Sequence, residues 1–121
     1  MTQLLLLFLA GGLGTLARYG LNTLVGSMIT HDYPYGTSVV NAVGCLLIGI
    51  VFGLANHDGW VKDHAPILMV GFLGAFTTFS AFANEAAELM RNERFVSFSL
   101  YIGLQNLVGI TFVLLGLRLV R

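Results

Sequence analysis

Charged residues are scarce in this chain of 121 residues: six basic and six acidic side chains make up 10% of it, and the net charge is zero. A soluble globular domain carries roughly 25% charged residues. The balance of signs removes any electrostatic basis for binding nucleic acid or for a polybasic attachment to a membrane surface. Because hydrophobic residues account for 56% of the chain, its composition indicates an integral membrane protein.

Residues that carry covalent or metal chemistry are also few. Cys45 is the single cysteine, which excludes an internal disulfide and favours the role of a small buried hydrophobe. His31, His57 and His64 lie in polar connectors without the spacing of metal ligands. The apolar segments contain no nucleophile–base pair, phosphate-binding loop or paired carboxylates, so nothing in the sequence supports an enzyme.

Four apolar segments are long enough to cross a bilayer, because about 20 residues of helix span its hydrocarbon core of about 30 Å. The N-terminus lacks the positive region of a cleaved signal peptide, so we expect the first segment to remain as a span. Lipid does not tolerate exposed irregular backbone, and the segments are therefore expected to be helices. The sequence predicts an all-α membrane protein with a single transmembrane domain over residues 1–121 and spans at about 4–25, 36–55, 65–83 and 95–117. Polar connectors lie between them at residues 27–35, 56–64 and 91–94.

Small residues are frequent in every span. Gly49 and Gly53 form a G-x-x-x-G pair in the second span, and glycines punctuate the other three. Small residues let transmembrane helices approach closely. The pattern favours a compact bundle with extensive helix contact, and contact between chains.

Positive charge does not favour one orientation in the membrane. With four spans, both termini share one side with the second connector. That side holds three basic residues, Lys62, Arg118 and Arg121, and the other holds two or three: Arg91, Arg94 and, toward that end of its helix, Arg18. The positive-inside rule therefore cannot choose a topology. A chain without a preference is able to insert in both orientations.

Two polar side chains interrupt the apolar spans, and each admits two interpretations. An arginine such as Arg18 costs about 2.5–3.5 kcal/mol on insertion scales when it is central in a span. It either snorkels to the headgroups or sets a positive potential at a water-filled vestibule that attracts anions. The amide of Asn41, in the middle of the second span, either bonds to a neighbouring helix or lines a pore as a donor. Thr37 is one turn away on the same face, which favours a polar track.

The run GFLGAFTTFSAF, residues 71–82, combines two glycines with adjacent threonines in mid-membrane, which weakens a helix. Broken helices at membrane depth occur where backbone lines a cavity or binds an ion, and freed carbonyls suit a hard cation. Phe79 and Phe82 share a face if the helix resumes after the break. The alternative is a pair of lipid-facing aromatics, and the nearby hydroxyls of Thr77, Thr78 and Ser80 argue against it.

Three segments together resemble the signature segments of the Fluc/CrcB fluoride channels: GGLGTLARY (11–19), PYGTSVVNAVGCLLIG (34–49) and GFLGAFTTFSAFANE (71–85). The resemblance covers essentially the whole chain in the same order. It implies a dual-topology homodimer of two antiparallel copies in the bilayer of a bacterial inner membrane. It also implies a broken third helix, and two parallel pathways through which fluoride leaves the cytoplasm passively.

The resemblance further implies roles for individual residues. The backbone carbonyls of Gly74 and Thr77 from each chain would hold a buried structural sodium ion at the dyad. Together with Thr37 of the polar track, the expected fluoride pathway comprises Asn41, Phe79, Phe82, Ser80, Tyr101, Arg18 at the vestibule and Glu85 beside the path. The chain departs from common family residues at Ala75, Ala81 and Gln105, which alters the expected track of hydroxyls.

Two rival classes make different demands on the sequence. A proton-coupled exporter of the small multidrug type needs a carboxylate embedded in the membrane. The first two spans contain none, and Glu85 and Glu88 lie near the end of the third. An assembly subunit that does not transport would need neither the interrupted third span nor the intramembrane polar residues.

Overall fold

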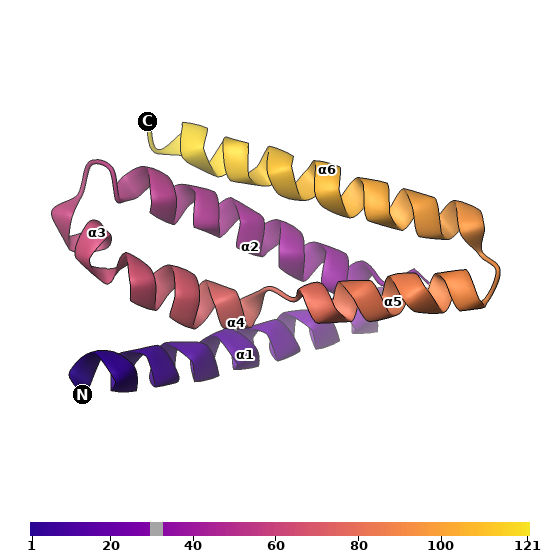
Figure 1. The fold of residues 1–121 in the computed structure, drawn as a ribbon, viewed down its shortest axis with the longest axis horizontal. Helices are drawn as coiled ribbons and strands as arrows, with labels where there is room; N and C mark the ends of the chain where they lie inside the picture. Colours follow the sequence, from indigo (N-terminus) through magenta and orange to yellow (C-terminus); the bar gives the residue numbers. More distant parts are fainter. Residues whose placement is uncertain (30–32) are drawn as a thin grey trace.

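The computed structural model describes residues 1–29 and 33–121; residues 30–32, which include His31, lie outside the described residues. The described part of the chain is helical and contains four stretches long and apolar enough to cross a membrane: Thr2–Met28, Tyr35–Leu54, Gly59–Arg91 and Phe95–Leu119. Both termini lie at the end of the bundle that carries α3, opposite the turn between α5 and α6 (Figure 1). The four-span prediction is confirmed at this level.

The first, second and fourth spans are continuous helices: α1 (Thr2–Met28), α2 (Tyr35–Leu54) and α6 (Phe95–Leu119). The third is built from four pieces: α3 (Gly59–Pro66), the π-helix η1 (Ile67–Leu73), α4 (Gly74–Phe76) and α5 (Phe79–Arg91). The third span therefore accounts for all of the irregular helical geometry in the described spans.

The second connector is shorter than the sequence predicted, because six of its nine residues, 59–64, are helical. Asp58 caps α3, and its carboxylate accepts a hydrogen bond from the backbone N–H of Val61 at 3.1 Å. A capping carboxylate of this kind satisfies an amide that the first helical turn leaves unpaired. Helix α3 thus begins at Gly59, before the expected start of the span at residue 65. The change to η1 comes directly after Pro66, which has no amide hydrogen for a helical bond.

Glycines set how closely the spans pack. A Cβ atom at Gly49 on α2 would collide with the carbonyl of Val113 on α6, and one at Gly116 would collide with the carbonyl of Leu46. At Gly14 on α1, a Cβ would meet the carbonyl of Phe72 in η1. These positions let backbone approach backbone, as in other membrane helix pairs.

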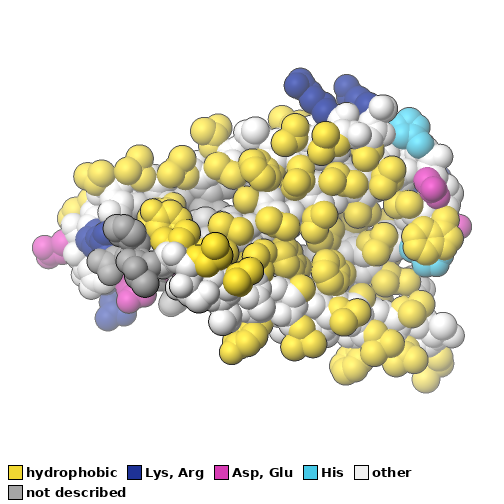
Figure 2. Space-filling view, turned by 180° about the vertical axis from the view of Figure 1, so that it is seen from behind, with side chains coloured by type: hydrophobic (Ala, Val, Ile, Leu, Met, Phe, Trp, Pro, Cys, Tyr) yellow, Lys and Arg dark blue, Asp and Glu magenta, His cyan; other side chains and the backbone are white. Residues whose placement is uncertain are grey.

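The surface of the single chain is apolar through its middle. Hydrophobic side chains cover the centre of the face in Figure 2, and charged side chains lie at its periphery. Large residues along α1 and α6 are well exposed, such as Phe8 at 76% and Leu107 at 67%. A soluble protein rarely exposes apolar surface on this scale, so this distribution is that of a multi-pass protein surrounded by lipid.

Candidate functional site

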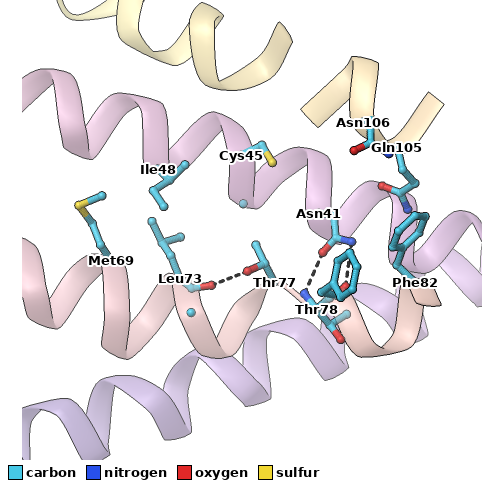
Figure 3. Close-up of a pocket in the computed structure, with 13 residues that line it drawn as sticks. Asn41, Cys45, Ile48, Met69, Leu73, Thr77, Thr78, Phe82, Gln105 and Asn106 are labelled. Carbon is cyan, nitrogen blue, oxygen red and sulfur yellow. Dashed lines mark hydrogen bonds between the residues drawn. The ribbon is translucent and has the colours of Figure 1, made fainter. Parts of the chain in front are cut away.

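A cavity of about 310 Å³ lies where the third span is interrupted, between α2, the η1–α4–α5 segment and α6 (Figure 3). Its walls are mainly apolar, and polar groups enter from α2, α6 and the interruption itself. No charged side chain lies among its described lining residues, which are Asn41, Gly44, Cys45, Ile48, Met69, Leu73, Gly74, Thr77, Thr78, Phe79, Phe82, Gln105 and Asn106.

The interruption occupies Thr77 and Thr78, whose backbone is extended between α4 and α5. Both the N–H and the hydroxyl of Thr77 donate to the carbonyl of Leu73, each at 3.0 Å. The hydroxyl of Thr78 accepts from the N–H of Ala81 at 3.1 Å and so caps α5. The two threonines close one helix and open the next, a use of their hydroxyls that helix caps commonly show.

Asn41 joins α2 to this interruption through both ends of its amide. Its Nδ2 donates to the carbonyl of Thr78 at 3.1 Å, and its Oδ1 accepts from the N–H of Thr78 at 2.9 Å (Figure 3). The side chain thus replaces the helical partners that Thr78 lacks at membrane depth. Of the two interpretations of Asn41, the bond between helices is confirmed, and the same side chain lines the cavity.

Two phenylalanines follow the interruption and line the cavity. The rings of Phe79 and Phe82 lie 5.5 Å apart between centroids, tilted by 60°. Phe82 also contacts the ring of Tyr101 at 5.3 Å. Phe79 remains 77% exposed, so its ring is accessible on the surface of the single chain.

Two hydroxyls of the expected pathway, those of Thr37 and Tyr101, meet at the carboxylate of Glu85, which belongs to the same expected pathway. The hydroxyl of Thr37 donates to Oε1 of Glu85 at 2.6 Å, and the hydroxyl of Tyr101 donates to Oε2 at 2.5 Å. Tyr101 is fully buried and Thr37 is 5% exposed. The half-buried carboxylate of Glu85 thus has a donor on each of its oxygens.

Arg18 and Ser80 lie on a different cavity, of about 540 Å³, between α1, α2 and α5. Thr37, Thr78 and Glu85 also border it. The expected pathway residues therefore fall on two sides of the third span, with Asn41, Phe79 and Phe82 on one and Arg18 and Ser80 on the other. Thr78 lines both cavities.

Comparison with known proteins adds an independent observation. The sequence matches the family described as CrcB-like protein, Camphor Resistance (CrcB), over residues 5–117. The chain belongs to this family. Relatives named fluoride-specific ion channel FluC include a protein of Nitratidesulfovibrio vulgaris, 45% identical over 97% of this chain and 95% of its own length. Those of Solidesulfovibrio magneticus and Phocaeicola vulgatus are 40% and 39% identical, over 93% and 97% of this chain and 91% and 97% of their own lengths.

Within this CrcB-like chain, the carbonyls of Gly74 and Thr77 are released from helical bonding. In a continuous helix they would accept from the amides of Thr78 and Ala81, four residues later. The amide of Thr78 donates to Asn41 instead, and that of Ala81 donates to the hydroxyl of Thr78. Freed backbone oxygens are suitable ligands for a hard cation. Gly74 and Thr77 therefore fit the structural sodium ion that the family resemblance implies.

Gln105 and Ser38 take part in the same network of the CrcB-like chain, although the sequence did not single them out as site residues. Nε2 of Gln105 donates to the hydroxyl of Ser38 at 3.2 Å and to that of Tyr101 at 3.3 Å. The available signal was a pair of adjacent amides, Gln105 and Asn106, within the apolar fourth span. The hydrogen-bond partners of Gln105 became visible only through the packing of α6 against α2. Ala75 and Ala81, the other two departures from common family residues, supply no hydroxyl to the expected polar track.

Proposed function

We propose that this chain is a fluoride channel that lets fluoride leave the cytoplasm passively across a bacterial inner membrane. The observation that carries the proposal is the cavity at Thr77 and Thr78. Amide groups, hydroxyls and aromatic rings converge there, without a charged residue among the described lining. The curated relatives named as fluoride-specific channels, which match nearly the full chain, support the same assignment.

The chemistry of the cavity suits a small, strongly hydrated anion. Fluoride loses water in a narrow pore only if other groups replace its hydrogen bonds. Amide N–H groups, hydroxyls and the positive edges of aromatic rings provide that replacement. None of them carries a full positive charge, so the ion is not held too tightly to leave. Arg18, on the separate cavity between α1, α2 and α5, would raise the local concentration of anions at the entrance.

The functional unit in this proposal is an antiparallel homodimer in which the interrupted third spans of the two copies cross. The exposed ring beside the interruption supports it, because Phe79 lines the cavity and is 77% exposed in the single chain. A second copy laid on this face would close the cavity and present its own Phe79. The even distribution of basic residues removes the usual barrier to opposite insertion.

A structural sodium ion at the dyad is the second part of the dimer proposal. Gly74 and Thr77 of each copy would contribute backbone oxygens, and sodium would link the two interruptions. Its role is to neutralise carbonyl dipoles that no amide satisfies at that depth. Side-chain ligands are not required by this arrangement, in keeping with the lack of any cluster of three His, Cys, Asp or Glu in the described part of the chain.

Growth of a bacterial strain that cannot expel fluoride tests the proposal directly. Expression of the chain should restore growth on fluoride and leave sensitivity to cationic drugs unchanged. A proton-coupled multidrug-type exporter would instead protect against such drugs. An assembly subunit would protect against neither, and either result would contradict the channel assignment.

A further inference from the structure

Gln105 links the cavity lined by Asn41 to the hydroxyl of Tyr101 through a hydrogen bond. Its side chain extends from α6 toward Phe82 and the cavity that Asn41 lines (Figure 3). Its amide nitrogen also contacts the hydroxyls of Ser38 and Tyr101. Glu85 is absent from the described lining of that cavity and borders the cavity of about 540 Å³ that Arg18 and Ser80 also line. Gln105 is therefore the described cavity residue that is hydrogen-bonded to the Tyr101–Glu85 pair.

The donors and acceptors in this chain of bonds run in one direction. An amide nitrogen has two hydrogens and accepts no bond, so Gln105 donates to the oxygen of Tyr101. The single hydrogen of the Tyr101 hydroxyl is then directed at Oε2 of Glu85, at 2.5 Å. A hydroxyl that accepts one bond becomes a stronger donor in the next. The series Gln105, Tyr101, Glu85 thus ends on the carboxylate, which Thr37 holds from its other oxygen.

We propose that Gln105 is a positioning residue of the fluoride pathway: its amide donates to the Tyr101 hydroxyl, strengthens the bond from that hydroxyl to Glu85 and so keeps the Glu85 carboxylate away from the cavity. The inference rests on the proposed function. A carboxylate that turned into the cavity would repel fluoride over a short distance in a medium of low dielectric. In the observed arrangement, the rings of Phe82 and Tyr101 lie in contact, 5.3 Å apart between centroids. The carboxylate is bonded to the Tyr101 hydroxyl and is not among the described residues of the cavity lining.

Fluoride efflux from liposomes, measured in a double-mutant cycle, tests this role. Gln105→Met keeps the length of the side chain and removes both donors. Gln105→Glu keeps its shape and replaces the donor by an acceptor that competes with Glu85 for the Tyr101 hydrogen. We expect each variant, and Tyr101→Phe, to lower efflux at least about tenfold, and we expect Gln105→Met to add little in the Tyr101→Phe background.

The cycle separates positioning from packing. Substitution of a residue that only fills space would lower efflux by the same factor in the wild-type and Tyr101→Phe backgrounds, and that result would overturn the inference. Normal efflux of Gln105→Met and Gln105→Glu would also overturn it. Gln105→Leu, which also removes both donors and adds no charge to the cavity, covers the case in which Gln105→Met does not fold. Thr111→Val, on the exposed side of α6, is the matched control and should conduct normally. Failure of the wild-type protein to release fluoride would instead overturn the proposed function.

Discussion

At the scale of single residues, hydrogen-bond satisfaction and the ion path depend on the same side chains. Asn41 pairs with both backbone groups of Thr78 and also faces the cavity. Its two duties are compatible if a passing anion meets the Nδ2 hydrogen that does not point at the Thr78 carbonyl. An amide nitrogen has two hydrogens, and the bond to Thr78 uses one of them.

Asn41→Leu should therefore damage stability as well as conduction. The substitution leaves the N–H and carbonyl of Thr78 without their side-chain partner, at a cost of about 1–3 kcal/mol for each buried group. Thermal unfolding in detergent measures that loss. Asn106→Leu is the matched control, because Nδ2 of Asn106 donates to a carbonyl of its own helix, that of Ile102. Equal stability of the two variants would show that the Asn41 bonds are not structural.

Phe82→Ile separates the electrostatics of the ring from its bulk. Isoleucine keeps a large apolar side chain but lacks the positive ring edge that an anion meets. We expect fluoride efflux to fall at least about tenfold, a barrier increase of about 1.4 kcal/mol, in a dimer that still assembles. Phe82→Met should be tolerated better, because its polarisable methyl end can also meet an anion, and Phe79→Ile should resemble Phe82→Ile.

Phe72→Ile controls for the loss of a ring–ring contact in these variants. Phe72 stacks on Phe76 with centroids 6.0 Å apart and is not among the described residues of the cavity lining. Its substitution should leave efflux within a few fold of the wild type on packing grounds alone. Normal flux of both Phe79→Ile and Phe82→Ile would assign these rings to lipid or packing contacts.

At the scale of elements, the third span differs from the others because its backbone bonds change partners along its length. Helix α3 gives way to the π-helix η1 and then to α4, which ends at Phe76. The sequence predicted weakness from residue 71 onward on the basis of glycine and threonine. It did not predict the π-helix or the cap at Asp58, because hydropathy and composition do not record which carbonyl an amide selects.

Gly74→Val should be severe and Thr77→Ser mild if backbone oxygens at the interruption hold a cation. In the single chain, a Cβ at Gly74 lies 3.5 Å from the carbonyl of Met69, an ordinary contact. A severe loss of dimerisation and activity would therefore arise from a clash with the partner copy or from loss of the bound cation. Gly103→Val on α6, where a Cβ meets nothing within 4 Å, is the control. A dimer equally stable and active after complete sodium removal would contradict the site.

At the scale of the whole molecule, the four spans followed from the sequence, because twenty apolar residues leave few alternatives in lipid. The anomalies of Asn41 and Thr37 also pointed to the site, since polar groups in mid-membrane need partners. The convergence of Thr37, Tyr101 and Gln105 near Glu85 could not be read in advance. It depends on how α2, α5 and α6 pack, and no local pattern in the chain encodes their rotation.

Antiparallel assembly predicts that the membrane contains both orientations of the chain. A cysteine introduced at Gln3 in a Cys45→Ala background should be labelled from both sides by an impermeant reagent. Lysines added at Asn56 and His57 should bias insertion and lower activity, and a partner biased the opposite way should restore it. Labelling from one side only in the variant without added lysines would contradict dual topology.

The most direct test of the central claim is the release of anions from liposomes that contain the purified protein. Vesicles loaded with equal fluoride and chloride should release fluoride, recorded with a fluoride electrode, when potassium efflux through an ionophore balances the charge. Chloride should stay inside, and a proton gradient should not be required. Retention of fluoride, or release of both anions at similar rates, would contradict the assignment of this chain as a fluoride-selective channel.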